Sequence, residues 1–302
     1  MEVRDLKIRK DSAKDLVRQL KASGGFTAKK LGVSVDIIRR MLGDKQSLNF
    51  LSFPADIVAT GTRGVLKDMV KKRWFDVVVT TCGTIDHDIA RSFGKYYHGT
   101  FDADDADLLE QGIHRLGNVY IHQRDYGELI ERKMTSWLSS LSEEGRNELS
   151  TSELCGEIGS RLKDDSILYW AWKNKIPVVV PGITDGAVGY QLWAYSQNHK
   201  FKVDVLKDEQ MLADRVFEAK HSGALILGGG ISKHHVIWWN AFKEGLDYAV
   251  YLTTAQEFDG SLSGARMKEA ISWGKLKANA LHITVEGDVT ISLPLIYASL
   301  LD

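Results

Sequence analysis

The sequence predicts a doubly wound α/β fold with a mainly parallel sheet, helices on both faces of the sheet, and a small helical arm at the N-terminus. Four short apolar runs each end in a loop of threonine, glycine and acidic residues, and helical stretches separate these runs. A continuous apolar run is typical of a strand buried on both faces. Strands that alternate with helices indicate a parallel sheet with helices covering it.

Residues 1–45 show helical periodicity without a buried strand, and we expect them to pack as an arm on a main domain at 46–302. The segment "FTAKKLGVSVDIIRRML" is similar to a helix-turn-helix, with Gly32 at the turn. A DNA-reading module usually carries a basic surface, whereas the net charge of this chain is −1. A packed arm is therefore the favoured interpretation, and no nucleic-acid partner is expected.

The first apolar run, "FDVVVTTCGTIDHD" (75–88), predicts a strand followed by a glycine turn. Asp86 follows this turn, where an acid can hydrogen-bond a ribose hydroxyl. Capping of a helix N-terminus is the alternative for Asp86 and stays open. Cys82 lies near the turn and, taken alone, is more typical of a packed thiol than of a nucleophile. The next segment, "ADLLEQGIHRLG" (106–117), predicts a helix.

Two further runs, "IPVVVPGITDG" (176–186) and "GALILGGGISKHH" (223–235), repeat the arrangement, and "DEQMLADRVFEAKHSG" (208–223) predicts a helix between them. Glycines allow backbone N–H groups to approach an anion, so the three glycines of "GALILGGGISKHH" hint at pyrophosphate binding. A tight turn is the alternative. His234 suits general acid–base work, or it caps the turn. Adjacent helical side chains point about 100° apart, so His234 and His235 make a poor metal pair and no metal is expected.

The fourth run, "DYAVYLTTAQEFDGS" (247–261), leads into a loop rich in glycine and serine, and "EAISWGK" (269–275) follows it. In that segment a tryptophan and a glycine stand directly before Lys275, where an apolar helical stretch breaks. A lysine amine is a nucleophile at neutral pH only if its surroundings disfavour the ammonium form, and an indole wall does this. The alternative is a lysine that caps a helix end and points outward.

The composition excludes several classes of protein. With 302 residues and 44% hydrophobic residues the chain can form a large core, and its two cysteines are too few for a disulfide framework. The charged N-terminal residues predict no signal peptide, and no apolar run has the length of a membrane span. We therefore expect a cytoplasmic enzyme or binding protein without a membrane partner.

Polar residues that follow parallel strands gather at the carboxyl edge of the sheet, where such folds bind ligands.

Several segments together resemble the deoxyhypusine synthase family, in particular its archaeal type. "GIHRLGN", "IPVVVPGITDG", "LGGGISKHH", "DYAVYLTTAQEFDGS", "SGAR" and "EAISWGK" stand in the order of that family and near its spacing. The resemblance runs from about Phe50 to the C-terminus and is looser in the N-terminal arm. The block "DGS…SGAR…SWGK" is the most specific part of it.

The resemblance implies a single Rossmann-like domain that assembles as a homotetramer with active sites at dimer interfaces. It implies a transferase that uses NAD. In this reaction NAD takes a hydride from the secondary-amine carbon of spermidine, and the imine then loses diaminopropane. The butylimine passes to an enzyme lysine, then to one lysine of the translation factor 5A precursor, and hydride returns from NADH to give deoxyhypusine.

Residue roles follow from the same resemblance. It makes Lys275 the nucleophile, His234 a group that orients the polyamine and shuttles protons, and Glu269 the partner of an amine cation. The positions implied for the amine pocket are Trp273, Trp238, Tyr190 and Gly264. The positions implied for NAD are Asp56, Thr81, Cys82, Gly83, Thr84, Asp86, Asp185, Gly228, Thr254, Ala255, Asp259, Gly260, Ser263 and Asp288.

The sequence departs from the best-known eukaryotic members at several positions. Tyr190 and Leu262 stand where those members have acids that meet the cationic ends of the polyamine, and Trp238 stands where they have an asparagine. Loss of a charge-assisted hydrogen bond lowers affinity by ~1–3 kcal/mol. Two alternatives therefore stay open: a related NAD-dependent aminobutyltransferase with another amine as donor or acceptor (homospermidine formation), and a weakly active subunit that scaffolds a paralogue.

Overall fold

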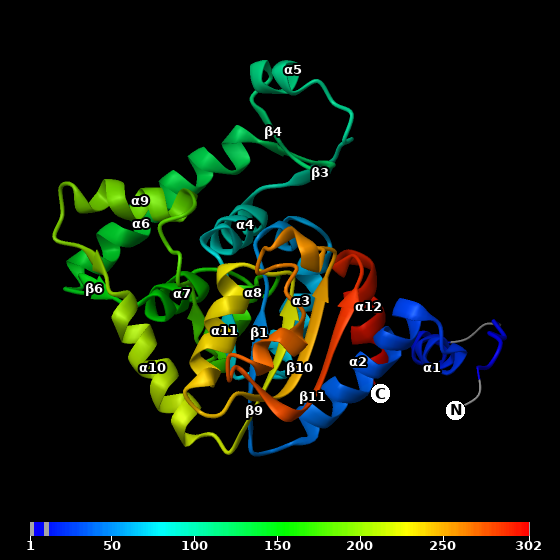
Figure 1. The fold of residues 1–302 in the computed structure, drawn as a ribbon. Coiled ribbons are helices and arrows are strands. Elements are labelled where there is room, and N and C mark those ends of the chain that lie inside the picture. The colour runs from blue at the N-terminus through cyan, green and yellow to red at the C-terminus, as the bar shows by residue number, and fades with distance from the viewer. Residues whose placement is uncertain (1–2, 9–11, 302) are drawn as a thin grey trace. The chain divides into compact units, whose positions relative to one another are not determined.

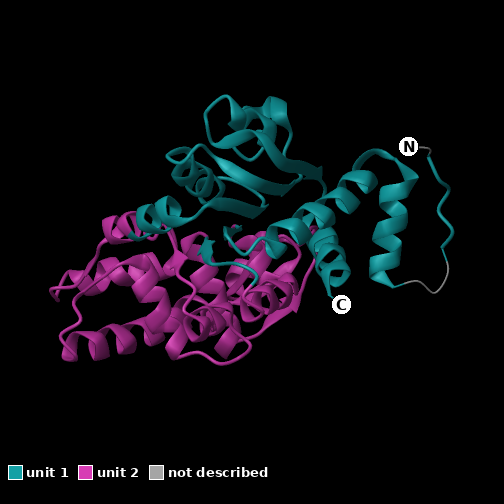
Figure 2. Ribbon diagram, turned by 90° about the horizontal axis from the view of Figure 1, so that it is seen from below, with its two compact units in different colours: residues 1–53, 74–79, 211–302 teal, residues 54–73, 80–210 magenta. Residues whose placement is uncertain are grey.

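The computed structural model describes residues 3–8 and 12–301, which form two compact units. Unit 1 contains the described parts of 1–53, 74–79 and 211–302, and unit 2 contains 54–73 and 80–210 (Figure 2). The predicted boundary between an arm and a main domain near residue 45 stays a prediction. Residues 1, 2 and 9–11 of the predicted arm and residue 302 of the predicted main domain lie outside the described residues.

Unit 1 contains a parallel sheet with the strand order β11-β10-β9-β1-β2 (Figure 1). Each pairing of neighbours in this series is parallel, with Phe50 opposite Ala224 and Ala249 opposite Ala224 in register. The order of strands reverses direction between β1 and β9, and ligands of such folds bind at the carboxyl ends of strands around this point. The strands are β1 (Ser47–Ser52), β2 (Val77–Val79), β9 (His221–Leu227), β10 (Leu246–Thr253) and β11 (Leu276–Glu286).

Helices flank this sheet. Helix α11 (Ile231–Ala241) packs against β1, β2, β9 and β10, and α2 (Phe26–Gly43) packs against β1, β10 and β11. Figure 1 shows α11 in front of the strands, and α2 with α12 (Val289–Leu300) behind them. The predicted α/β class with a mainly parallel sheet is therefore confirmed. Helix α10 (Val205–Glu218) contains the boundary between the units, and it confirms most of the helix predicted at 208–223.

The N-terminal helices are formed as expected, but the predicted turn at Gly32 is wrong. Helix α1 (Ala13–Ser23) starts at a Ser12 cap and ends at Gly24, which has a φ of 72°. Helix α2 continues through Gly32 without a break. A Cβ on Gly32 would lie 2.4 Å from the Cβ of Lys21, so this glycine allows α1 and α2 to approach closely.

Unit 2 is mostly helical. Its longer elements are α3 (Thr62–Lys71), α4 (Cys82–Phe93), α6 (Gly127–Glu143), α7 (Thr151–Ser160), α8 (Ile167–Asn174) and α9 (Ala187–Ser196). Its short strands include β6 (Glu148–Leu149), β8 (Lys202–Val203) and β7 (Val178–Val179), the strand predicted from "IPVVV". Unit 2 also contains the 3₁₀ helices η1 (Asp56–Ala59) and η2 (Gln123–Asp125).

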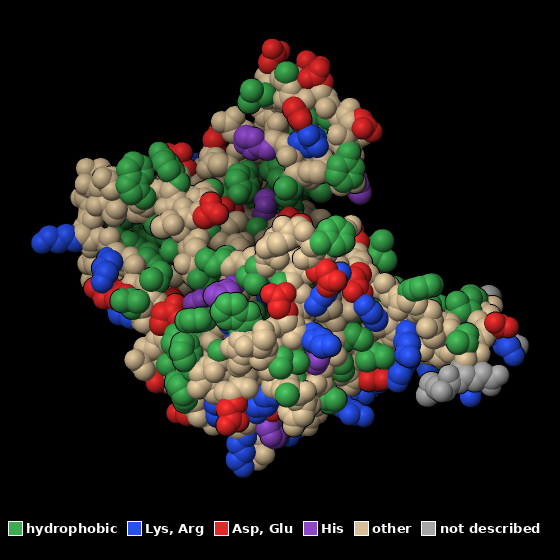
Figure 3. Space-filling model, in the orientation of Figure 1, with side chains coloured by type: hydrophobic (Ala, Val, Ile, Leu, Met, Phe, Trp, Pro, Cys, Tyr) green, Lys and Arg blue, Asp and Glu red, His purple; other side chains and the backbone are tan. Residues whose placement is uncertain are grey.

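One predicted helix of unit 2 is largely wrong. Residues 106–117 were expected to be helical, but α5 (Asp105–Glu110) is short, and β4 (Ile113–Leu116) follows it. Gly112 takes a φ of 65°, which ends the helix, and β-branched Ile113 begins the strand. The chain then forms a three-stranded antiparallel sheet from β3 (Tyr96–His98), β5 (Val119–His122) and β4. Acidic side chains gather over α5 in Figure 3.

Candidate active site

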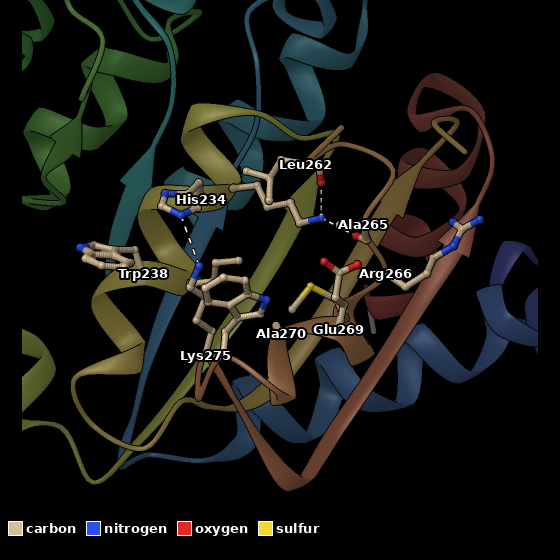
Figure 4. A pocket seen from close by; sticks show the side chains of 12 residues that line it. His234, Trp238, Leu262, Ala265, Arg266, Glu269, Ala270 and Lys275 are labelled. Atoms are coloured by element: carbon tan, nitrogen blue, oxygen red, sulfur yellow. Dashed lines mark hydrogen bonds between the residues drawn. The ribbon is translucent and has the colours of Figure 1, made fainter. Parts of the chain in front are cut away.

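A cavity of about 320 Å³ lies in unit 1 between α11, the loop at 262–266 and the 3₁₀ helix η4 (Met267–Ile271). Figure 4 shows the side chains of its lining, with Lys275 and His234 turned toward each other. The lining combines aromatic, acidic, basic and apolar side chains, among them Lys233, His234, Trp238, Leu262, Glu269, Trp273 and Lys275.

The glycine before Lys275 has a local structural role. Helix η4 ends at Ile271, and Gly274 takes a φ of 65°, a conformation that favours glycine. The Lys275 N–H then donates to the carbonyl of Ala270 at 2.9 Å, while its own carbonyl accepts from Leu246 at 3.2 Å. Strand β11 starts at the next residue. The turn therefore fixes Lys275 between a helix end and the sheet, with little freedom in its backbone.

The Lys275 side chain is buried, with 8% of its surface exposed, instead of pointing into solvent. Its Nζ lies 3.3 Å from Nε2 of His234. The same nitrogen lies 5.2 Å from the ring centroid of Trp273 and 5.5 Å from that of Trp238. An imidazole and two indoles thus surround the amine, and Trp273 and Trp238 are themselves partly exposed at 68% and 45%.

His234 is positioned by the first turn of α11. Its N–H donates to the Gly230 carbonyl at 3.0 Å, and its ring stacks on Trp238 with centroids 5.7 Å apart. Burial, reinforced by nearby Lys275, lowers the pKa of His234 from its ordinary value of 6.5. The imidazole is therefore neutral at pH 7, and Nε2 can accept a proton or a hydrogen bond from the lysine.

The remaining predicted pocket residues differ in position. Glu269, on η4, is exposed and lines the cavity with its carboxylate toward it (Figure 4). Leu262 lines the cavity from the loop. Gly264 has no room for a side chain, because a Cβ there would lie 1.9 Å from the Gln256 carbonyl oxygen. Tyr190 belongs to α9 of unit 2 and is 59% exposed.

The predicted cofactor residues of unit 1 follow three neighbouring parallel strands. Gly228 follows β9 with a φ of 69°, and Gly230 has a φ of 113° just before α11. A Cβ on Gly229, between them, would lie 2.6 Å from Cα of Ser263, so the glycine turn is packed against the loop. The positions Thr254, Ala255, Asp259, Gly260 and Ser263 follow β10, and Asp288 follows β11 and caps α12.

In unit 2 the predicted cofactor residues include three buried side chains. Asp86 is fully buried, and its carboxylate accepts from the N–H groups of Ala187 and Val188 at 2.9 and 2.8 Å and from the Tyr126 hydroxyl at 3.1 Å. It therefore binds the first N–H groups of α9, but it lies inside α4 and does not cap the helix that follows its own turn, so the capping expected from its spacing is wrong. Burial raises the pKa values of both Asp86 and Cys82. The hydroxyl of Thr84 lies 2.6 Å from that of Thr80. The other predicted positions in this unit, Asp56, Thr81, Gly83 and Asp185, are exposed or half-buried.

Sequence reasoning missed Lys233, which lies directly before His234. This lysine is 2% exposed, and burial, reinforced by Arg266 and opposed by Glu269, lowers its pKa to about 8. Its only signal in the sequence was a lysine at the start of a helix that follows a buried strand. Among the described residues, no group of histidine, cysteine and acidic side chains could hold a metal ion. Within the same residues, no helix is long and apolar enough to cross a membrane.

The parallel sheet and the cavity beside it define an α/β protein with a buried lysine at its candidate site. The family model of deoxyhypusine synthase matches residues 15–300. The chain therefore belongs to the deoxyhypusine synthase family, a family of transferases.

Archaeal relatives agree with this assignment. A protein of Ignicoccus hospitalis named "Probable deoxyhypusine synthase" is 53% identical over 99% of this chain and 95% of its own length. Proteins of the same name from Thermoplasma volcanium and Picrophilus torridus are 51% and 50% identical, each over 99% of this chain and 97% and 96% of their own lengths.

Solved structures support the fold. A presumed deoxyhypusine synthase from Entamoeba histolytica superposes with a TM-score of 0.66 at 21% identity and covers 96% of this chain and 93% of its own. A structure of AgrE with ornithine and NAD⁺ gives a TM-score of 0.55 at 12% identity and covers 90% of this chain but 33% of its own. At these identities the likeness concerns the fold alone.

Proposed function

We propose that this protein transfers the aminobutyl group of spermidine to one lysine of the translation factor 5A precursor, with NAD as cofactor, and so makes deoxyhypusine. The observation that carries the proposal is the buried Lys275 amine, 3.3 Å from a neutral His234 in an indole-lined cavity. Membership of the deoxyhypusine synthase family supports the same reaction.

The glycine turn after β9 fits a dinucleotide. Gly230 precedes α11 without a side-chain cap, so the first N–H groups of that helix are available to a pyrophosphate. When bound, NAD supplies the hydride acceptor for the oxidation of the donor amine and the hydride donor for the final reduction, so no external oxidant is needed. In unit 1 we assign its contacts to exposed and half-buried positions: Gly228, Thr254, Ala255, Asp259, Gly260, Ser263 and Asp288.

The lysine acts through its neutral amine. His234 takes the proton of the Lys275 ammonium at Nε2, which leaves a lone pair to attack the C=N carbon of the oxidised spermidine. The attack forms a new C–N bond, and His234 passes the proton to the imine nitrogen. A second proton from the Lys275 nitrogen then reaches the same leaving nitrogen, so the C–N bond to diaminopropane breaks as the C=N bond to Lys275 forms, and diaminopropane leaves as an amine. The butyl group is then held on Lys275 as an imine, until the amine of the acceptor lysine attacks the same carbon and releases Lys275.

The cavity holds the donor by its charge and its aromatic surface. Glu269 contributes the carboxylate that pairs with an ammonium end. Trp238 and Trp273 offer ring faces to a cation, each worth ~0.5–2 kcal/mol. The apolar part of the lining, including Leu262, keeps water away from an imine that water would hydrolyse.

A labelling experiment tests this proposal. The protein is incubated with NAD and spermidine labelled in its butyl group, with and without the translation factor precursor, and both proteins are analysed for label. We expect label on the precursor when it is present, and label on Lys275 after borohydride reduction when it is absent. Lys275→Arg keeps the positive charge but cannot form the imine and should stay unlabelled, whereas Lys277→Arg should be labelled like the wild type. Labelling of Lys275→Arg would refute the role of this lysine.

A second function is an aminobutyl transfer with another amine as donor or acceptor. The observation that favours it is Leu262, which brings no carboxylate to the cavity lining. Michaelis constants for spermidine, agmatine and putrescine separate the two functions. Turnover of agmatine or putrescine far above that of spermidine would replace the first proposal by the second. The buried Lys275 argues against the remaining alternative, a weakly active subunit that scaffolds a paralogue.

We also propose a homotetramer with active sites at dimer interfaces. Family membership supports this assembly. The candidate cavity has the partly exposed rings of Trp238 and Trp273 in its lining, and these would become buried in such an interface. Sedimentation or light scattering of the purified protein gives the mass, and a monomer at micromolar concentration would contradict the assembly.

A further inference from the structure

Unit 1 buries a second ammonium group beside the candidate site, at Lys233. Its Nζ donates to the carbonyls of Leu262 at 2.7 Å and Ala265 at 2.6 Å, marked by the dashed lines at these residues in Figure 4. It also lies 3.9 Å from the ring centroid of Tyr251. None of the ion pairs among residues 3–8 and 12–301 involves Lys233.

The same loop is held from a second direction. The carbonyl of Ser263 accepts from the hydroxyl groups of Tyr251 and Thr253, the latter at 3.1 Å. Three carbonyls, at 262, 263 and 265, are therefore fixed by side chains of α11 and β10. This arrangement turns the loop backbone toward the sheet, while Leu262 lines the cavity.

Glu269 acts on Lys233 electrostatically but does not form an ion pair with it, and an ammonium buried without a paired carboxylate is an unusual way to stabilise a fold. Desolvation of a charge disfavours burial by several kcal/mol unless hydrogen bonds compensate, and an apolar residue of similar size is often more stable. Here the hydrogen bonds are all directed to one loop. That loop contains Ser263, one of the proposed cofactor positions, and Leu262, which lines the cavity proposed for the amine, so its shape affects both sites.

We propose that Lys233 is a positioning residue that holds the loop 262–265 in the shape required by both the cofactor and the amine. The inference rests on the proposed function for the identity of the two ligands. Its structural part, the ordering of the loop by Lys233, is independent of them.

The variant Lys233→Met tests the inference, because methionine replaces the aliphatic part of the lysine up to Cε and removes the donors. Hydrogen–deuterium exchange of the amides at 262–266 should become at least tenfold faster, as expected for one or two lost charge-assisted hydrogen bonds. Lys233→Arg keeps a charged donor of different shape at this position and should restore part of the slow exchange. The control Lys277→Met removes a lysine that pairs with Asp247 outside the cavity lining, and it should exchange like the wild type.

Binding and kinetics give the functional half of the test. In Lys233→Met the dissociation constant of NAD and the Michaelis constant of spermidine should both rise about tenfold, with kcat changed much less, since a misplaced loop weakens binding. Unchanged exchange at 262–266 would overturn the inference. Faster exchange with unchanged NAD and spermidine constants would overturn its functional half.

Two further outcomes keep the tests separate. If wild-type protein does not bind NAD, the proposed cofactor fails, while the exchange experiment still decides the role of Lys233. If Lys233→Met does not fold, Lys233→Gln replaces it, because this variant keeps a polar group at the site and removes the ammonium that donates to both carbonyls. Unchanged exchange at 262–266 in a folded Lys233→Gln protein would then overturn the inference.

Discussion

The two compact units bury charge in opposite ways. Unit 2 buries the carboxylates of Asp86, Asp88 and Asp208, and each accepts at least three hydrogen bonds from its own chain. Among the described residues of unit 1, the buried ammonium groups are those of Lys233 and Lys275, and both line the cavity. The buried acids bind backbone and side-chain donors and hold segments together, whereas of the buried lysines Lys233 binds two loop carbonyls and Lys275 faces His234 at the cavity wall.

The largest expected effect concerns a saturated acid. Asp88 accepts from Arg63 at 2.7 Å and from the N–H groups of Ile167 and Leu168 at the start of α8. Asp88→Ala leaves a buried guanidinium without its main partner and should reduce the free energy of unfolding by about 3–5 kcal/mol. Urea unfolding followed by circular dichroism measures this loss. The exposed acid Asp105 provides the control, since its alanine variant should unfold near the wild-type midpoint. A loss for Asp88→Ala under about 1 kcal/mol would make it no different from a surface pair.

The buried Lys233 should make the free energy of unfolding depend on pH. Burial lowers the pKa of Lys233 from 10.5 to about 8. Below pH 8 the lysine is protonated in the folded and unfolded chain alike, and the unfavourable burial of its charge is fully present. Between about pH 8 and 10.5 only the unfolded chain keeps the proton, so wild-type stability should rise relative to Lys233→Met, by about 3 kcal/mol at most.

This pH dependence is measured as the difference between the two unfolding curves, because titrating tyrosines affect both proteins equally. A difference that stays constant from pH 7 to 10.5 would mean that Lys233 keeps its ordinary pKa despite burial.

Variants of Asp86 test whether this acid stabilises the fold or binds the cofactor. Its carboxylate caps α9 through Ala187 and Val188, so Asp86→Ala should lower the free energy of unfolding by ~1–2 kcal/mol, as the loss of a helix cap does. The affinity for NAD should stay close to that of wild type at a temperature where the variant is folded. Asp259→Ala, on the exposed loop after β10, should weaken NAD binding in the same assay. The reverse result would assign the ribose contact to Asp86.

The smallest expected effects lie at the mouth of the cavity. Trp238→Ala removes a ring whose centroid is 5.5 Å from Lys275 Nζ, and it should weaken spermidine binding by ~0.5–2 kcal/mol. Leu262→Asp adds a carboxylate to the lining and should tighten spermidine binding or leave it unchanged. Michaelis constants for spermidine and putrescine decide both. Unchanged Michaelis constants for Trp238→Ala would show that this indole does not contribute to amine binding.

The strands that were predicted from sequence are those whose burial leaves a continuous apolar run. β2, β9 and β10 are of this kind, and so is β7, although only Val178 and Val179 pair. Strand β11 was not expected, because it alternates apolar residues with polar ones such as Lys277 and Asn279 and follows a segment with helical character. The hairpin of β4 and β5 was missed because Gly112, which ends α5, was interpreted as part of a longer helix.

The candidate site divides in the same manner. Lys275 and His234 were predicted from motifs and lie together in the structure. Lys233 was not predicted, because nothing in a sequence indicates which of two successive helical residues turns under a loop. The carboxylate of Asp86 could not be assigned either, since its partners at 187 and 188 are about a hundred residues away in the chain.

Two successive residues in the first turn of α11 determine the surroundings of the two buried lysines of unit 1: Lys233 is one of these lysines, and His234 contacts the other. Lys233 lies under the loop, while His234, about 100° around the axis of α11, faces Lys275. Both directions are set by the start of the helix at Gly230, with its φ of 113°. A substitution that alters this start, such as Gly230→Ala, acts on both lysine environments at once. Mutational data from the first turn of α11 therefore need a double-mutant cycle before they can be attributed to either lysine.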